Sequence, residues 1–253
     1  MDYTIAETYE LPSKGKIYKQ NVSPMVTIRS MTTTEEMRRL SHTDYPYKAL
    51  CDTIDACIIE PVGISSYDMC LGDYQFLLHK LRVVTYGSNY PSSSICPICG
   101  KVNKTTLNLD DIKVKMYTEP VEGEPDPTVI VLPKTGRNIV LKYQTPRDLD
   151  EIAKEERDFK ANNPDSEINI SYLLTLKHLV AMIDGSPVLG AKLDIFLRNL
   201  PMVDTNFLLK KATELNERIG LDNIILNKCS NPKCGVQYST TFRITGEFFG
   251  PEV

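Results

Sequence analysis

Two short cysteine motifs decide how this chain is organised: Cys96-Pro97-Ile98-Cys99-Gly100 and, near the end of the chain, Cys229-Ser230-Asn231-Pro232-Lys233-Cys234-Gly235. Each ends in Cys-Gly, and glycine permits a backbone twist that a larger residue resists. A tetrahedral zinc ion takes four thiolates at about 2.3 Å, and two such turns facing each other would supply them. We therefore predict one zinc ion bound by Cys96, Cys99, Cys229 and Cys234. The alternative is four ordinary cysteines, because the second motif is Cys-x4-Cys and paired Cys-x2-Cys motifs are the stronger signal.

The predicted zinc site also sets the domain boundaries. Four thiolate ligands leave no open coordination position, so the ion would be structural. Segments typical of strands flank both motifs, which indicates a zinc-ribbon-like β element made of residues 91–111 and 224–253. If the two halves share one ion, residues 112–223 are an insertion and residues 1–90 form an N-terminal unit. The predicted fold class is α+β.

The N-terminal unit is predicted to contain strands, a shaped turn and a small group of helices. The turn spans Leu11 to Tyr18, where Pro12 fixes φ and Gly15 permits a positive φ. Helices are predicted over residues 34–42, 46–59 and 67–86. The first begins with a capping box, formed by Thr33 and Glu36 or by Thr32 and Glu35. The last has a stripe of apolar side chains at helical spacing, which we expect to be buried: Tyr74, Leu77, Leu78, Leu81 and Val84.

The insertion is predicted to hold a hairpin followed by a helical bundle. The hairpin strands lie at about 128–132 and 138–143. Thr145 and Pro146 suit the N-cap and first position of a highly charged helix over 146–162. A buried helix is predicted over 168–183, and a further helix is predicted to be capped by Asp204 and to end at Gly220.

Composition and charge exclude several classes of function. The chain has 253 residues and a formal net charge of -4, which disfavours bulk binding to nucleic acid or to an anionic membrane. No apolar run approaches the length of a membrane span, and the first residues lack the features of a signal peptide. We therefore expect a reducing cytoplasm, which suits thiolate ligands. The remaining cysteines, Cys51, Cys57 and Cys70, are expected to be small buried residues.

The sequence has no recognisable catalytic constellation. His42, His79 and His178 are isolated from one another, and each is expected to be exposed at a tip or satisfied within the core. There is no phosphate-binding loop motif and no nucleophile-elbow motif. We therefore predict that the protein is not an enzyme and has no small-molecule substrate.

Several stretches together carry a resemblance to a known family. Leu11-Pro12-Ser13-Lys14-Gly15-Lys16-Ile17-Tyr18 comes first, and Gly72 to Tyr90 runs directly into Cys96-Pro97-Ile98-Cys99-Gly100. This order resembles the baseplate hub proteins of T-even-like tailed bacteriophages. The resemblance implies a non-enzymatic protein of the central hub of a contractile-tail baseplate, acting during assembly or within the particle. Its partners would be other hub or tail proteins, and its location the host cytoplasm during assembly or the virion tail baseplate.

Two further expectations concern function. The alternative to a hub protein is a zinc-ribbon nucleic-acid-binding accessory factor. Against it, the sequence has no Arg/Lys-rich stripe with interleaved aromatic residues. For the hub reading, we expect the docking surfaces to be the N-terminal segment around Leu11 to Tyr18 and the charged helix 146–162. Deletion of residues 1–18 is then expected to leave a folded protein that no longer joins hub complexes.

Overall fold

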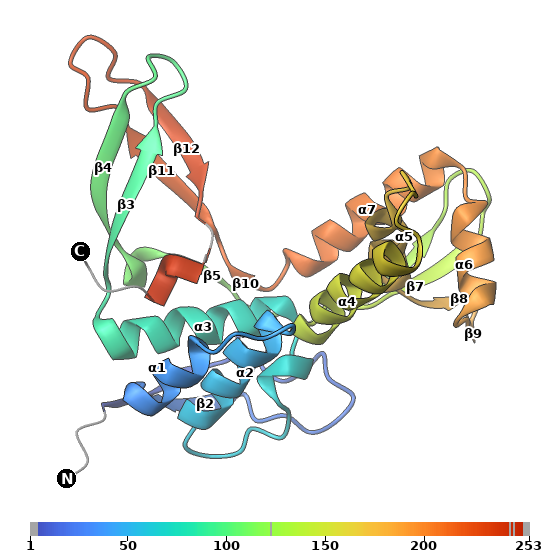
Figure 1. Cartoon of the computed structure of the whole chain (residues 1–253), viewed down its shortest axis with the longest axis horizontal. Helices are drawn as coiled ribbons and strands as arrows, with labels where there is room; N and C mark the ends of the chain where they lie inside the picture. The colour runs from blue at the N-terminus through green and yellow to red at the C-terminus, as the bar shows by residue number, and fades with distance from the viewer. Residues whose placement is uncertain (1–4, 122, 243, 245, 250–253) are drawn as a thin grey trace.

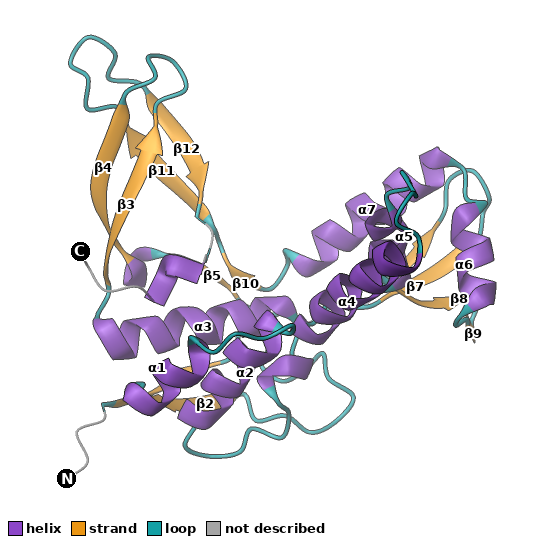
Figure 2. Ribbon diagram, in the orientation of Figure 1, coloured by secondary structure: helices purple, strands orange, loops and turns teal. Residues whose placement is uncertain are grey.

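The computed structural model describes residues 5–121, 123–242, 244 and 246–249 of the chain. Within these residues it has seven α-helices, four two-stranded antiparallel sheets and one four-stranded antiparallel sheet (Figures 1 and 2). The predicted α+β class is confirmed. Figure 1 shows three regions: a base around helix α3, a narrow ribbon of strands that rises from the base, and a lobe of helices and strands to one side.

The base is built from β1 (Ala6–Glu10), β2 (Met25–Arg29), α1 (Thr33–Arg39), α2 (Pro46–Cys57), the 3-10 turn η1 (Ser66–Asp68) and α3 (Leu71–Tyr86). Strands β1 and β2 pair antiparallel. The capping box of α1 is formed by Thr32 and Glu35, which decides between the two predicted possibilities. The predicted apolar stripe of α3 is buried, and Leu77 has no exposed surface. Helix α3 is thus the central element of the first hydrophobic core.

The turn from Leu11 to Tyr18 is part of this core, which argues against the expectation that the protein stays folded without residues 1–18. Leu11 and Ser13 have no exposed surface. The buried carboxylate of Asp73 accepts a hydrogen bond from the Ser13 backbone N–H at 2.9 Å, another from the Ser13 hydroxyl, and a third from the Tyr18 hydroxyl at 2.6 Å. Deleting this segment would uncover the core and leave a buried carboxylate without its donors, which is costly.

The ribbon consists of two antiparallel hairpins from distant parts of the sequence. The first is β3 (Asn89–Ile95) with β4 (Val102–Asn108), and the second is β11 (Ile224–Lys228) with β12 (Gln237–Thr241). The 3-10 turn η2 (Leu109–Asp111) follows β4. Below the hairpins, β5 (Val114–Lys115) pairs with β10 (Gly220–Leu221), so the chain leaves and returns at the same place.

Two glycines allow helix α3 to pass directly against β10. A Cβ on Gly72 would lie 2.3 Å from the carbonyl oxygen of Ile219, and a Cβ on Gly220 would lie 2.7 Å from the Cα of Gly72. Gly220 also has φ = 112°, a conformation that favours glycine. This close approach fixes the base of the ribbon on α3. The 3-10 turn η3 (Gly246–Phe249) adds the buried rings of Phe248 and Phe249 beside it.

The lobe contains a four-stranded sheet and four helices. The sheet has the order β6 (Val129–Val131), β7 (Asn138–Leu141), β8 (Val180–Ile183) and β9 (Ser186–Pro187). The helices are α4 (Pro146–Asn162), α5 (Ile170–Lys177), α6 (Ala191–Arg198) and α7 (Met202–Asn216). Thr145 and Pro146 begin α4 as predicted, with Asp148 completing a capping box. The lobe has its own apolar core, separate from that of the base.

Three predictions for the lobe are wrong. The expected helix over 168–183 ends at Lys177, and Val180–Ile183 is instead a strand between β7 and β9, because pairing in the sheet buries Val180 and Ile183 in the apolar core of the lobe. Asp204 does not cap α7, whose N-cap is Pro201. Its buried carboxylate instead accepts hydrogen bonds from the backbone of Lys134 and Thr135 in the β6–β7 turn, at 2.7 and 3.0 Å. Gly220 lies beyond the end of α7, in β10.

Candidate metal centre

The four cysteines of the two motifs meet at the tip of the ribbon. Cys96 follows β3 and Cys99 lies in the turn before β4, while Cys229 follows β11 and Cys234 lies in the turn before β12. The four Sγ atoms all lie within 4.8 Å of one another. The Sγ atoms of Cys96 and Cys234 are 3.9 Å apart, and those of Cys99 and Cys229 are 3.5 Å apart. Folding therefore brings together all four residues that the spacing singled out.

These distances fit a four-coordinate metal ion and not a disulfide. A disulfide requires a sulfur–sulfur distance of about 2.05 Å, and all four cysteines are free thiols. For sulfur ligands at about 2.3 Å from a central ion, a tetrahedron has edges of about 3.8 Å. The two short Sγ–Sγ distances bracket this value. The arrangement is thus compatible with one ion held by four thiolates, with no position left for substrate.

Backbone hydrogen bonds stabilise each cysteine turn. In the first, the Cys96 N–H donates to the Lys101 carbonyl at 2.9 Å, and the Gly100 N–H donates to the Cys96 carbonyl at 3.0 Å. In the second, the Cys229 N–H donates to the Val236 carbonyl at 2.9 Å. Gly100 and Gly235 have φ values of 70° and 57°, which explains the glycine after each second cysteine.

The local electrostatics favour a thiolate at Cys99. The backbone N–H of Lys101 hydrogen-bonds to this sulfur and, together with the neighbouring thiols, lowers the pKa of Cys99 to about 6. The thiolate is the form that binds a metal ion, and within the same cluster the pKa of Cys229 is raised to about 11 and that of Cys234 is also raised, so the first proton is lost from Cys99. The backbone N–H of Asn231 also reaches the Cys229 sulfur at 3.4 Å.

Asn103 and Tyr238 join the two hairpins below the cysteines, and sequence reasoning missed both. The Asn103 side-chain amide donates to the Tyr238 hydroxyl at 2.9 Å and accepts from the Ser230 backbone N–H at 2.8 Å. The Tyr238 hydroxyl also lies 2.8 Å from the Ser94 hydroxyl. These contacts join residues far apart in sequence, and no local pattern indicates them. They align the two turns that carry the thiols.

The other three cysteines are not part of the centre. Cys51 and Cys57 lie in α2 and Cys70 precedes α3, and all three are buried, as predicted. Burial raises the pKa of Cys51 and Cys70 to about 12 and that of Cys57 to about 11. Buried thiols that remain protonated are inert.

A second group of potential ligands, Asp148, Glu151 and His178, has a structural explanation. Asp148 accepts hydrogen bonds from the Thr145 backbone N–H at 2.9 Å, from the Lys142 ammonium at 2.8 Å and from the His178 ring at 2.9 Å. Both carboxylate oxygens of Asp148 are therefore occupied by donors of the protein itself. The group caps α4 and connects it to the sheet and to α5.

The buried histidine also has a structural explanation. His79 in α3 is buried, and its Nε2 lies 3.1 Å from the carbonyl oxygen of Leu109. Burial lowers its pKa to about 4, with the Lys80 charge as a secondary cause, so the ring is neutral at physiological pH. It connects α3 to the base of the ribbon through Nε2, whereas its buried Nδ1 has no hydrogen-bond partner among the described residues, so the expectation of a core-satisfied histidine holds for one ring nitrogen only.

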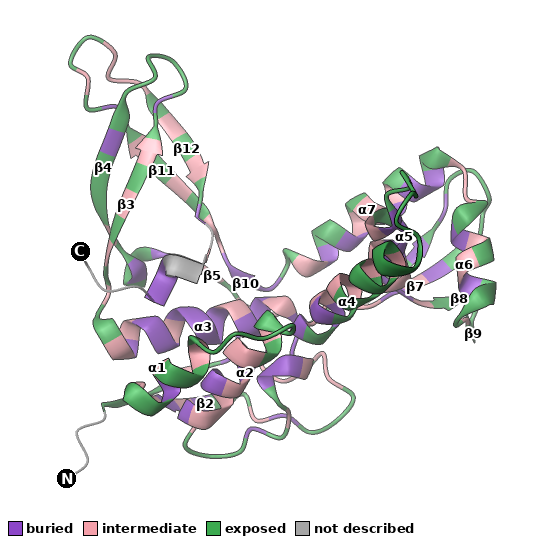
Figure 3. Cartoon of the chain, in the orientation of Figure 1, coloured by how far each residue is buried: buried purple, intermediate pink, exposed green. Residues whose placement is uncertain are grey.

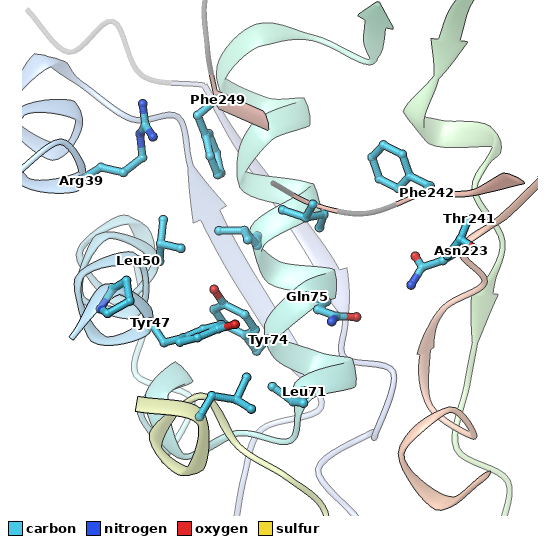
Figure 4. Close-up of a pocket in the computed structure, with 14 residues that line it drawn as sticks. Arg39, Tyr47, Leu50, Leu71, Tyr74, Gln75, Asn223, Thr241, Phe242 and Phe249 are labelled. Carbon is cyan, nitrogen blue, oxygen red and sulfur yellow. The ribbon is translucent and has the colours of Figure 1, made fainter. Parts of the chain in front are cut away.

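A pocket of about 610 Å³ lies between α2, α3 and the chain after β12 (Figure 4). Tyr47 and Leu50 come from α2, Leu71 and Tyr74 from α3, and Phe249 from the C-terminal segment. Arg39 lies at its rim, where it is paired with Glu36 at 2.6 Å and stacks on the Phe249 ring. Among the described residues that line it there is no nucleophile beside a base, so the pocket offers no catalytic arrangement.

Comparison with known families gives one match that spans nearly the whole chain. A family model described as T4 bacteriophage base plate protein matches residues 3–250. The chain belongs to this family. It is therefore a protein of a T4-like phage baseplate, which is a structural assembly. No curated protein and no solved structure gave a significant match. None of the helices in the described ranges is long and apolar enough to cross a membrane.

Proposed function

We propose that the chain is a non-enzymatic structural or assembly protein of the central hub of the baseplate, acting through contacts with other phage tail proteins. Its membership of the baseplate family over residues 3–250 is the observation that carries this proposal. The hub role rests on the motifs of the first hundred residues, which resemble hub proteins. Assembly would take place in the host cytoplasm, before or during incorporation into the tail.

We further propose that Cys96, Cys99, Cys229 and Cys234 bind one structural zinc ion. The support is the four-sulfur donor set and the Sγ–Sγ distances of 3.5 and 3.9 Å. Such an ion would join the two hairpins and supply no chemistry of its own. It would make the ribbon one element and residues 112–223 an insertion, with residues 1–90 as the N-terminal unit. The pairing of β5 with β10 and the separate apolar core of the lobe support the insertion, whereas the first core joins the N-terminal unit to Leu109, Leu221 and Phe248.

Isolation of complexes from infected cells tests the hub role. Tagged full-length chain is expressed during phage infection, and bound proteins are identified after washing at moderate salt. We expect identified tail-hub subunits in stoichiometric amounts. A matched variant, Cys99→Ser with Cys234→Ser, should no longer bind the hub subunits that dock on the ribbon. Retention of DNA through moderate salt, with no tail subunit bound, would contradict the hub role.

A further inference from the structure

The ribbon carries a charge opposite to that of the rest of the chain. Residues 89–108 and 224–241 contain four lysines and neither aspartate nor glutamate: Lys101, Lys104, Lys228 and Lys233. The whole chain has a formal net charge of -4, so removing these four positive charges leaves -8 for the remainder. Even with a zinc ion and four thiolates in place, the ribbon would keep a net positive charge. It is a basic projection on an acidic protein.

The four lysines have no acidic partner within the described part of the chain. All four are exposed, and none of them takes part in an ion pair between described residues. The Lys101 ammonium reaches only the Ser230 carbonyl, at 3.5 Å. These charges are therefore available to a partner.

Much of the ribbon is exposed (Figure 3), and several of its exposed residues are aliphatic. Ile95 and Val102 are paired across the first hairpin, and Ile98 in the turn beside them is 72% exposed. On the second hairpin, Leu226 is 85% exposed and shares its face with Lys228, two residues on. Solvent-facing sides of antiparallel sheets are normally polar, so a mixture of aliphatic and cationic groups marks a contact surface.

The composition of these faces favours a protein partner over nucleic acid. The ribbon has no arginine, and its two tyrosines are used internally. Tyr90 packs against Phe242 and Phe248, and Tyr238 hydrogen-bonds to Ser94 and Asn103. Arginines and exposed aromatic rings, which grip phosphates and stack on bases, are thus missing from the outer faces.

One segment of this chain has the complementary chemistry. Residues 118–127 contain four carboxylate side chains, three prolines and no lysine or arginine. Prolines favour an extended backbone, which suits docking along a sheet. Val121 in this segment is 67% exposed and offers an apolar group between the acidic residues. The start of the segment lies at the base, where the Tyr117 N–H donates to the Pro12 carbonyl and Glu119 lies 3.7 Å from Lys16.

We propose that the outer face of the ribbon of one copy binds the acidic segment 118–127 of a second copy. The two surfaces differ, so the contact is heterologous and every copy offers both halves. Such contacts close into a ring or extend into a filament. The inference does not depend on the hub role, because it follows from the charges and exposed side chains of this chain alone.

Sedimentation velocity of the purified full-length protein tests the association. At low ionic strength we expect a sedimentation coefficient that rises with protein concentration, and reversal to monomer at about 1 M salt, where the Debye length is about 3 Å. A monomer at every concentration in low salt, or binding of the protein to double-stranded DNA in preference to itself, would overturn the proposal.

Charge reversal tests the identity of the two surfaces. The ribbon variant is Lys104→Glu with Lys228→Glu, and the loop variant is Glu124→Lys with Asp126→Lys. Each alone is expected to be monomeric, and an equimolar mixture should associate again, because the glutamates introduced into the ribbon of one variant then meet the lysines introduced into the loop of the other, while the unaltered ribbon and loop still meet each other. A control for the ribbon variant, Lys154→Glu with Lys192→Glu, makes the same change in net charge at other exposed positions and should associate like the wild type. Association that survives in either variant, or a mixture that stays monomeric, would refute the assignment.

A peptide competitor keeps the test valid if a variant misfolds. A synthetic peptide of residues 118–127 in excess should dissociate the wild-type assembly, whereas the same peptide with lysine at its four acidic positions should not. Equal effects, or no effect, of the two peptides would exclude this segment as the occupant. Melting temperature and metal content identify variants that fold normally.

Discussion

The ribbon and the lobe are held together in opposite ways. Within the four strands of the ribbon only Asn103 is buried, and the facing side chains are largely serine, threonine, asparagine and tyrosine. The lobe encloses a continuous apolar core that includes Ile139, Leu141, Leu176 and Leu208. The ribbon therefore shows that two hairpins with almost no apolar core can project from a protein if the cysteine turns at their tip hold them together.

The magnitudes explain why the ribbon needs such a joint. Burying one leucine or isoleucine side chain stabilises a protein by about 1.5–3 kcal/mol, and the lobe has many of them. A typical hydrogen bond, such as those of Asn103 and Tyr238, contributes about 0.5–1.5 kcal/mol. Structural zinc contributes about 10–16 kcal/mol in small zinc domains. A metal ion at the tip would therefore supply the stabilisation that an apolar core supplies in the lobe.

Metal removal should give the largest difference in stability between the ribbon and the lobe. With a strong chelator, the ribbon is expected to lose its joint and its backbone protection, while the leucine-rich lobe keeps its own. Hydrogen exchange with and without chelator measures this. The ribbon amides should lose protection by several kcal/mol, and the amides of α5 and α7 should change little. Equal loss in both regions, or none in the ribbon, would contradict the comparison.

Truncation of a core leucine should have the converse effect. Leu208 in α7 has no exposed surface, so Leu208→Ala is expected to cost about 2–5 kcal/mol through lost burial and a cavity. The adjacent Leu209→Ala, on a partly exposed side chain, is the control and should cost less. Urea unfolding measures both, and the metal content of both should stay unchanged. A small effect at Leu208 would show that the lobe is not held by its core.

Acid should weaken the lobe through Asp148. Burial alone would raise the pKa of this carboxyl, but hydrogen bonds from His178 and Lys142 outweigh it and lower the pKa to about 2. Because the folded pKa lies below the unfolded value of about 3.9, the stabilisation is full above pH 4 and is lost as the pH falls towards 2.

The expected size of this effect is about 2 kcal/mol. The difference in unfolding free energy between the wild type and Asp148→Asn should therefore shrink by that amount between pH 5 and pH 2. Loss of metal in acid affects both proteins alike and cancels in the difference. A constant difference over this range would mean that the pKa of Asp148 is not lowered.

The polar contacts of the ribbon should matter least. Tyr238→Phe removes the hydroxyl shared by Ser94 and Asn103, and we expect a loss of about 1 kcal/mol in the metal-loaded protein. The same substitution in chelated protein should have almost no effect, since the hairpins are then already apart. Thermal unfolding under both conditions gives the two values. A loss as large as that of Leu208→Ala would show that polar contacts, not the tip, hold the ribbon.

Local sequence patterns predicted the elements whose signals lie close together in the chain. Thr145 and Pro146 set the start of α4, the apolar stripe of α3 is buried, and the cysteine spacing led to the sulfur cluster. The residues that set the α4 start and the buried face of α3 are neighbours in sequence, and the four cysteines share a preference for binding metal ions. The α+β class followed from the same signals.

What the sequence could not reveal depends on distant partners. The Leu11–Tyr18 turn looked like a free docking segment, because its acceptor, Asp73, lies in a helix sixty residues away. Val180 to Ile183 continued a helical pattern, but the neighbouring strand β7 recruits them into the sheet. Asn103 and Tyr238 belong to different hairpins and became partners only when the ribbon formed.

The metal content of the purified protein tests the central claim most directly. Elemental analysis should give one zinc per chain for the wild type and for the control Cys57→Ser. Cys57 is buried in α2 and is not one of the four cysteines at the tip of the ribbon. Cys99→Ser combined with Cys234→Ser should contain almost none. A zinc content well below one per chain in the wild type, or one that survives the double substitution, would contradict the account.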